Sequence, residues 1–432
     1  MNKRPIEIHR KYLDKCIYCM RLFGIWTFDS SATIFHKFMS AFGTIFNPTI
    51  LIFHFLTVLA DIIVNYNDLI IVADDGCFLA GSFTVCFKAY EFRILENIFT
   101  ELVNQVHIPV EILKKSCDSG VLTIIKQYIF FETLDFFILS YTVTCLGIGL
   151  IILLPLTRGG LPVRAIYPFD STKSIIYKLA FFIQAYNITF GLITIVALEF
   201  LSWGLMRWTI VQLKVLSSNY RHCNSDITPI GSLNVSKSTY DRIKNFSILK
   251  VDDEDIEIHN FIAFEEKEID SIDDCFNWRF KTCIKHHKRL IQIIHQLNSV
   301  FTTSLLVQLG VSSFLMCLNG YLAFMFPHDN QRLIRSIMYL IAGFVQLLYW
   351  CGFGNELKYQ VNDLATSQWM SGWEDKYDRG IKNLVTTAMI RAMQPMEVKA
   401  GGLFILSMET FLSILKTSYS VFVLLTTVSE DN

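Results

Sequence analysis

The stretch METFLSILKTSYSVFVLL, residues 408–425, is long and apolar enough to cross a bilayer, yet it carries two charges and several hydroxyl groups. On a helix at about 100° per residue, these groups and the nearby Thr427 fall within about 60° of one another. Polar side chains in lipid are costly, so such a stripe needs a partner helix or water. The stripe consists of Glu409, Ser413, Lys416, Ser420 and Thr427.

Two interpretations of this stripe stay open from the residues alone. The first is hydrogen bonding and ion pairing inside a helix bundle, with Glu409 and Lys416 two turns apart on one face. The second is a water-filled path enclosed by identical faces of several copies in a symmetric oligomer. In that case Leu424 and Val428, one turn apart, are narrow apolar points at which a pore closes by dewetting.

The whole chain has the composition of a polytopic membrane protein. Of its 432 residues 52% are hydrophobic and only 18% are charged, and the net charge of −1 gives no reason to expect a nucleic-acid partner. We predict an all-α fold with seven membrane helices of about 20 residues or more, in contact with membrane lipid. They are expected at roughly 38–62, 72–93, 129–156, 175–205, 293–326, 333–353 and 403–427.

The distribution of Lys and Arg predicts the orientation. Connections rich and poor in positive charge alternate along the chain, and the connection from Arg207 to Arg289 alone holds thirteen Lys and Arg residues. This pattern places the N-terminus in the cytoplasm and the C-terminus outside. The sequons at Asn187, Asn234 and Asn245 are then expected to stay unmodified, since one lies in a span and two in the cytoplasm.

These spans divide the chain into seven regions. We expect a cytoplasmic segment, four spans, a cytoplasmic connection, two further spans, a cytoplasmic helical layer, a last span and an external tail. The cytoplasmic connection contains an acidic insertion at 251–274, and the helical layer contains a short amphipathic helix at 379–393. The regions are 1–37, 38–205, 206–292, 293–353, 354–402, 403–428 and 429–432.

The acidic insertion has eleven acidic residues against one Lys. We interpret it as a disordered, solvated segment. The alternative is a rim that attracts cations or makes a regulatory contact.

Other signals for chemistry are weak. Cys16 and Cys19 form a single CxxC without a second pair at zinc spacing, and Cys283, His286 and His287 lack an accompanying catalytic motif. The eleven cysteines are scattered, so we expect no disulfide framework. We therefore predict no metal, no cofactor and no enzymatic activity.

Several motifs resemble those of insect odorant receptors. The segment VKAGGLFILSMETFLSILKTSYSVFVLL is similar to the last span of that family. FGNEL, LATSQWMSGW and IRAMQP resemble the connection before that span, and LAGSFTVCFKAYEF resembles the family's second span. The last span lacks the ending typical of gustatory receptors, which are an alternative with the same topology; a secondary transporter is a further alternative, although no internal repeat is visible.

The resemblance implies a ligand-gated, non-selective cation channel at the plasma membrane of sensory neurons. In this family, tuning subunits join odorant coreceptor subunits in a heterotetramer around one pore, and this chain resembles a tuning subunit. Carried onto this sequence, the pore and gate positions are Ser420, Leu424, Thr427 and Val428. The subunit anchor includes Trp373, Leu384 and Arg391.

The resemblance also implies a pocket for a small volatile organic ligand in the outer half of spans two, three, four and six. Such pockets are mostly apolar, with few polar groups that orient the ligand. Tyr339 is the leading candidate because it offers both an aromatic ring and a hydroxyl group. The candidates are Ser82, Phe83, Tyr141, Cys145, Phe181, Gln184, Met338, Tyr339 and Ala342.

Overall fold

The fold is a bundle of long helices. The computed structural model describes residues 11–28, 32–116, 118–153, 155–156, 160–169, 174–225, 257–268, 275–327, 330–376 and 378–430. Its long helices are α2 (Ile34–Val64), α3 (Leu69–Ile94), α5 (Ser119–Ile148), α7 (Ser174–Arg221), α10 (Phe276–Met325), α11 (Asn330–Trp369) and α13 (Met408–Glu430). Its shorter elements are α1 (Lys11–Leu22), α4 (Glu96–Leu113), the π-helix η2 (Gly149–Leu153), the 3₁₀ turns η4 (Glu266–Glu268) and η5 (Trp373–Asp375), α12 (Arg379–Ala392), β1 (Lys399–Ala400) and β2 (Phe404–Ile405).

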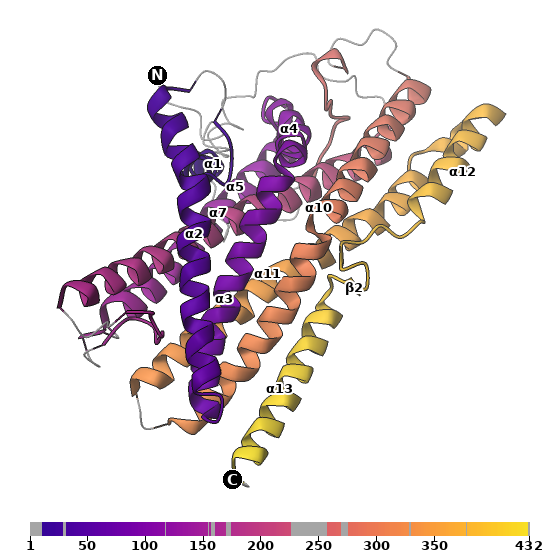
Figure 1. Cartoon of the computed structure of the whole chain (residues 1–432). Coiled ribbons are helices and arrows are strands. Elements are labelled where there is room, and N and C mark those ends of the chain that lie inside the picture. The colour runs from indigo at the N-terminus through magenta and orange to yellow at the C-terminus, as the bar shows by residue number, and fades with distance from the viewer. Residues whose placement is uncertain are drawn as a thin grey trace.

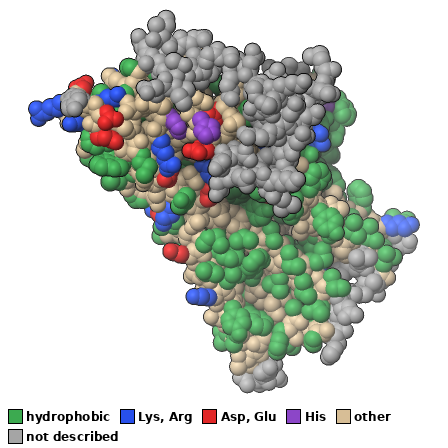
Figure 2. All heavy atoms as spheres, turned by 180° about the vertical axis from the view of Figure 1, so that it is seen from behind, with side chains coloured by type: hydrophobic (Ala, Val, Ile, Leu, Met, Phe, Trp, Pro, Cys, Tyr) green, Lys and Arg blue, Asp and Glu red, His purple; other side chains and the backbone are tan. Residues whose placement is uncertain are grey.

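Seven of these helices are long and apolar enough to cross a membrane, which confirms the predicted all-helical class and the number of spans. Apart from the two-residue strands, the described part of the chain is helix and connections. Figure 2 shows hydrophobic side chains over much of the lower half of one face, with most of the visible charged and histidine side chains above them. A surface of this kind suits contact with acyl chains.

The helices are arranged around α10, which packs against α3, α7, α11 and α13 (Figure 1). One end of the molecule carries α4 and α12, and we call it the α12 end. The opposite end, where α13 finishes, also carries the turn between α2 and α3, and we call it the Glu430 end. The last helix, α13, lies along the edge of the bundle beside α10 and α11.

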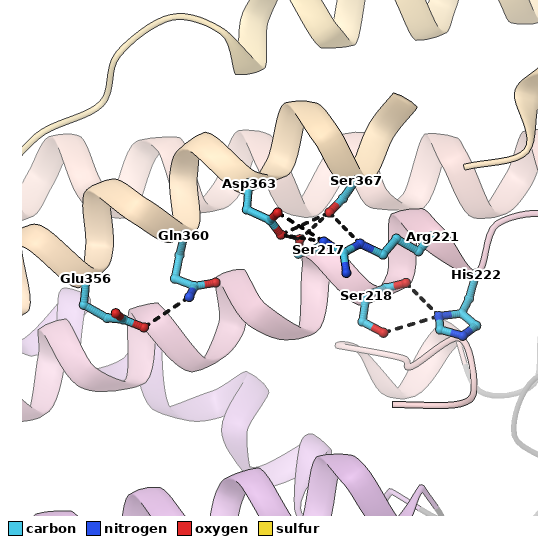
Figure 3. Close-up of polar contacts among 8 residues, drawn as sticks. All are labelled: Ser217, Ser218, Arg221, His222, Glu356, Gln360, Asp363 and Ser367. Atoms are coloured by element: carbon cyan, nitrogen blue, oxygen red, sulfur yellow. Dashed lines mark hydrogen bonds and ion pairs between the residues drawn. The ribbon is translucent and has the colours of Figure 1, made fainter. Parts of the chain in front are cut away.

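Three helices are much longer than a bilayer requires. α7, α10 and α11 have 48, 50 and 40 residues, whereas about 20 residues cross the hydrocarbon core. Each of these three helices therefore extends well beyond the hydrocarbon core. At the α12 end the extensions of α7 and α11 are joined by polar contacts (Figure 3): Arg221 Nη2 lies 2.9 Å from Asp363 Oδ2, and Arg221 Nε donates to Ser367 Oγ at 3.0 Å.

The amphipathic helix expected at 379–393 is α12. Its buried or half-buried residues are the apolar ones, including Val385 and Ala388, as the spacing predicted. The last span begins later than expected, at Met408 instead of residue 403. Gly401 and Gly402 have positive φ angles of 61° and 71°, and they turn the chain so that β2 pairs with β1 before the helix starts.

Gly354 of the FGNEL motif permits a close contact between α11 and this turn. A Cβ atom at Gly354 would lie 2.3 Å from the Cβ of Leu406, so only glycine fits. The glycine thus fixes where the chain enters α13.

The described part of the acidic insertion is packed, in contrast to the expected solvated segment. Phe261, Ile262 and Phe264 are at most 2% exposed. Asn219 on α7 holds this segment with two bonds: its Nδ2 donates to Ile262 O at 2.7 Å, and its Oδ1 accepts from Ile262 N at 2.8 Å. The apolar residues between the acidic runs account for the packing; residues 251–256 and 269–274 lie outside the described part.

Asp118 joins this segment to α5. Its Oδ1 caps the helix by accepting from Gly120 N at 2.9 Å and from Val121 N, and its Oδ2 accepts from His259 N at 2.9 Å and from Asn260. One carboxylate thus satisfies backbone donors of two elements far apart in sequence.

Asp118→Ala is expected to release residues 257–268 and to destabilise the protein by about 2–3 kcal/mol, because a helix cap and several charge-assisted bonds are lost together. Hydrogen–deuterium exchange of the purified receptor measures the amide protection of this segment. Asp68→Ala is the matched control: Asp68 caps α3 in the same way without touching the segment, so about 1 kcal/mol is lost and protection stays unchanged. Equal protection of 257–268 in both variants would contradict the role of Asp118.

Candidate ligand cavity and polar helix face

A cavity of about 180 Å³ lies between α2, α3, α5, α7, α10 and α11. Most of its wall is apolar, formed by residues such as Phe78, Val85, Ile138, Leu146 and Leu192. An apolar protein cavity of about 150 Å³ holds a benzene molecule. This cavity therefore suits a compact molecule of one ring with a few further heavy atoms.

The segment 160–169 packs beside the cavity wall. Gln184 on α7 binds the backbone of Val163 twice, with Val163 N donating to its Oε1 at 2.9 Å and its Nε2 donating to Val163 O at 2.9 Å. Arg164 Nε lies 3.2 Å from Asp61 Oδ2. Val163 packs against Leu150 and Ile188, which line the cavity.

A buried ion pair lies at the opposite side of the cavity. Lys88 on α3 pairs with Glu199 on α7, and both side chains are at most 7% exposed. Glu199 also accepts from Gln346 Nε2 at 2.7 Å and from Trp350 Nε1 at 2.8 Å, both on α11. Because Gln346 lines the cavity, the wall is bonded directly to a buried charge.

A second buried ion pair is arranged in the same way. Arg207 on α7 pairs with Asp135 on α5, and Tyr349 Oη donates to Asp135 Oδ1 at 2.7 Å. The ring of Trp203 stacks on Tyr349 with centroids 4.5 Å apart. Asp135, Trp203 and Tyr349 all line the cavity.

These two ion pairs were not predicted from the sequence. A signal was present, because Lys88, Asp135, Glu199 and Arg207 are charged residues in or beside apolar stretches. Which of these residues pair could not be predicted, because the partners lie on different helices and the sequence does not show how the helices pack.

Three of the nine candidate ligand residues lie on the cavity wall: Ser82, Tyr339 and Ala342. Phe83 and Tyr141 point outward, 43% and 73% exposed, and Gln184 is the clamp on Val163. Ligand contact by any of the nine stays a prediction. The remaining candidates, which are partly buried and off the wall, are Cys145, Phe181 and Met338.

The polar stripe of α13 faces away from the rest of the chain. The helix packs through Phe411 and Ser418, each 5% exposed, and Ser418 Oγ lies 3.0 Å from Ser313 Oγ on α10. The stripe lies about half a turn round the helix from this packed side. Its exposed residues are Glu409, Ser413, Lys416, Ser420 and Thr427.

The predicted gate residue Leu424 lies beside this exposed face. Leu424 is 62% exposed, and the side chain of Val428 lies outside the described part. The hydroxyl groups of Ser420 and Thr427 donate to carbonyls of their own helix, at 3.0 and 2.7 Å. These two hydroxyl oxygens therefore face the surroundings and bond to no other helix of the described chain.

The anchor candidates lie in and beside α12. Trp373 and Leu384 pack against the core, whereas Arg391 is exposed. Two large apolar side chains, one in the last turn of α12 and one at its C-cap, are also uncovered: Ile390 is 61% and Met393 67% exposed. They lie at the C-terminal end of α12.

One group of side chains has the spacing of a metal site, formed by Glu265, Glu268 and His286. The ammonium of Lys285 already lies 2.7 Å from Glu265 Oε2, and His286 Nε2 lies 2.7 Å from Glu268 Oε1. Burial alone would raise the pKa of Glu268, but the bonds from His286 and from two backbone N–H groups lower it below its usual range. We interpret the group as a structural network that holds the segment 257–268.

The cysteines do not favour a metal or a disulfide either. Every cysteine among the described residues is a free thiol. Burial raises the pKa of Cys16 in the CxxC motif to about 12, which disfavours the thiolate that a metal needs.

Comparison with known proteins decides the family. The model of the 7tm odorant receptor family matches residues 68–419, well over half of the chain. This chain belongs to the insect odorant receptor family. The family consists of seven-helix membrane receptors that act as ligand-gated channels and not as enzymes. This confirms the prediction of a ligand-gated channel family and the prediction that the protein is not an enzyme.

Individual relatives agree with this assignment. Odorant receptor Or2 of Anopheles gambiae is 30% identical over 149 residues, 34% of this receptor and 38% of that one, so this match spans less than half of the relative. Odorant receptor 83a of Drosophila melanogaster is 21% identical over 365 residues, 79% of this receptor and 77% of that one. Both are named as odorant receptors and not as the coreceptor.

The fold agrees with a solved structure. Olfactory receptor OR5 from Machilis hrabei superimposes with a TM-score of 0.74 at 14% identity, over 98% of this receptor and 99% of that chain. Its complex with eugenol gives 0.73 at 13% identity over the same shares.

The Lys88–Glu199 pair yields a stability prediction. Glu199→Gln leaves a buried ammonium group without its counter-charge and is expected to destabilise this receptor by about 3–5 kcal/mol. Lys88→Met added to Glu199→Gln is expected to recover most of the loss, because Gln still accepts from Trp350. Thermal unfolding of the detergent-solubilised variants measures this, and a double variant no more stable than Glu199→Gln would rule out the ion pair as the cause.

Proposed function

We propose that this receptor is the ligand-tuned subunit of a heterotetrameric, non-selective cation channel whose other subunits are odorant coreceptors. A small volatile organic ligand binds in the cavity, and the last helix of each subunit lines a central pore for permeant cations. The channel lies in the plasma membrane of sensory neurons, with the N-terminus of the chain in the cytoplasm. The observation that carries this proposal is the polar stripe of α13, which faces away from the chain's own helices.

The polar stripe favours a pore shared between subunits, because its side chains are unfavourable in contact with lipid. In an isolated chain, Lys416 and three hydroxyl groups would contact acyl chains, and burying polar groups in lipid costs free energy. Copies of the same face around one axis enclose water instead, and hydroxyl oxygens then line the path. Leu424 narrows this path with a bulky apolar side chain, as a gate that closes by dewetting requires.

The α12 end supports the contacts between subunits. Ile390 and Met393 are large, apolar and exposed at the end of the chain that the charge pattern places in the cytoplasm. A contiguous exposed apolar patch outside a membrane marks an interaction surface, and these two side chains lie within one helical turn of each other. The neighbouring Arg391 and the packed Trp373 complete the proposed anchor.

α11 supports a connection between ligand and gate. Gln346 and Tyr349 on this helix line the cavity, and Phe344 contacts Phe411 of α13 with ring centroids 5.2 Å apart. A ligand opens the pore only if it binds the open arrangement more tightly than the closed one. In this scheme, displacement of α11 by the ligand moves Phe411 and with it the face that carries Leu424.

Substituted cysteines test the pore. Each variant is co-expressed with the coreceptor and treated with a charged methanethiosulfonate reagent during ligand application. The variants Ser420→Cys, Leu424→Cys and Thr427→Cys are expected to react and to lose more than half of the evoked current. Ser418→Cys, on the packed side of the same helix, is expected to keep its current, as is the unsubstituted receptor. Current loss in Ser418→Cys alone would contradict the assignment of faces.

The same recordings separate a channel from a transporter. Evoked currents that reverse near zero and follow the permeant cations support a channel. Substrate uptake with a fixed ion stoichiometry would contradict it.

The anchor is tested by assembly. Ile390→Asp with Met393→Asp is expected to lower the amount of coreceptor that co-purifies with this receptor at least fivefold, because charges replace buried apolar contacts. Ile108→Asp is the matched control, since Ile108 is equally exposed at the α12 end but lies on α4. Unchanged co-purification of the double variant would place the subunit contact elsewhere.

A further inference from the structure

We infer that two glycines on the cavity wall, Gly191 and Gly81, set the size limit of the odorant, because the ligand fills the space that side chains would take at these positions. The odorants admitted are compact apolar molecules with a ring and a short alkyl chain. This inference rests on the proposed role of the cavity as the odorant site. It follows from where the two glycines lie and from what a side chain would meet there.

Gly191 lies in the middle of the side of α7 that faces the cavity. Ile188 and Ile195 line the cavity three residues before it and four residues after it, a spacing that puts all three positions on one face of the helix. Gly191 itself is buried and lines the cavity. A side chain at this position would therefore leave the helix on the cavity side.

A Cβ atom at Gly191 would meet very little. Outside its own stretch of helix, the one atom within 4 Å would be Val85 Cγ2 at 3.8 Å, which is an ordinary van der Waals contact. Val85 is also a wall residue, on α3. The space in front of Gly191 is therefore part of the cavity and is not filled by a neighbouring helix.

Gly81 has the same character on α3. Phe78, Ser82 and Val85 line the cavity on the same side of this helix, at the spacings expected for one helix face. A Cβ atom at Gly81 would meet nothing within 4 Å. Because Val85 lies one turn from Gly81 and beside Gly191, the two open positions lie near each other on α3 and α7.

Neither glycine is explained by the packing of the helices. Gly147 and Gly354 permit close contacts, since a Cβ atom there would lie 3.1 Å from Leu192 Cδ1 and 2.3 Å from the Cβ of Leu406. The wall glycines have no such contact, and they are not among the glycines with positive φ angles. Glycine within a helix is less stable than alanine. Open space for a ligand accounts for this cost.

The surroundings of the two glycines indicate which part of the ligand lies there. Val85, Ile188 and Ile195 are apolar wall residues on the same two helices, so the group between them is an alkyl chain or the edge of a ring. Protein interiors are closely packed, and a cavity of about 180 Å³ has little room to spare. A methyl group added at Gly191 must therefore displace an equal part of the ligand.

A homologous series tests the size limit. The probes are benzene, toluene, ethylbenzene, propylbenzene and butylbenzene, which make no polar contacts and differ by one carbon each. In Gly191→Ala, the affinity for butylbenzene relative to benzene is expected to fall about tenfold, the discrimination that one methyl group gives in an apolar site. Gly191→Val is expected to lower the ratio further and to weaken propylbenzene as well. Binding is measured by the concentration dependence of the thermal unfolding temperature of the purified receptor.

Gly204→Ala is the matched control, on the same helix. Gly204 is buried and is not a wall residue, and a Cβ atom there would lie 3.7 Å from Glu132 Oε1, an ordinary contact. This variant is expected to keep the ratio of the unsubstituted receptor. Without probe, both alanine variants are expected to unfold at the temperature of the unsubstituted receptor or above it, because alanine favours the helix. A loss of affinity for butylbenzene is then not a loss of folding.

An unchanged ratio in Gly191→Ala and Gly191→Val would overturn the inference and leave the proposed function standing. So would an equal fall of the ratio in Gly191→Ala and Gly204→Ala. If none of the five probes binds the purified receptor, the cavity does not take apolar ligands, and the proposed function itself is contradicted.

Discussion

A polar side chain within a bilayer must find a partner, and this constraint organises the receptor. Lys88 and Arg207 are placed inside the bundle against Glu199 and Asp135, where each carboxylate also accepts from α11. The stripe of α13 obeys the same constraint in a different way. Lys416 and the hydroxyl groups of the stripe make no hydrogen bond or ion pair with another helix of the described chain, so their partner is proposed to be water shared between subunits.

The ligand cavity lies next to the two buried ion pairs. Its wall is mostly apolar, but Gln346 and Tyr349 bind the carboxylates of the two buried ion pairs. A ligand that rearranges either residue therefore acts on bonds that join α11 to α5 and α7. The same helix contacts α13 through Phe344 and Phe411, so that one helix joins the cavity to the proposed pore.

The sequence predicted the features that depend on local pattern. Hydropathy gave seven helices, and the spacing in residues 379–393 gave the buried face of α12. The stripe of α13 followed from the positions of five polar residues, and the structure places all five on the exposed side. These predictions succeeded because each depends on one helix alone.

Features that depend on the relation between helices were not predictable in the same way. Spans that are apolar on every side do not reveal which face lines a cavity, and Tyr141 accordingly points outward while Tyr339 lies on the wall. The buried pairs join residues more than 70 positions apart. The packed part of the acidic insertion was not predicted. Its many acidic residues indicated a solvated segment, although apolar residues lie between them around Phe261 and Phe264.

The most direct measurement is a structure of this receptor assembled with coreceptor subunits in a lipid bilayer. The account predicts that Leu424 and Thr427 face a central axis and that water, not lipid, contacts Lys416 and Ser420. An assembly in which this face of α13 meets acyl chains, away from any axis, would contradict it.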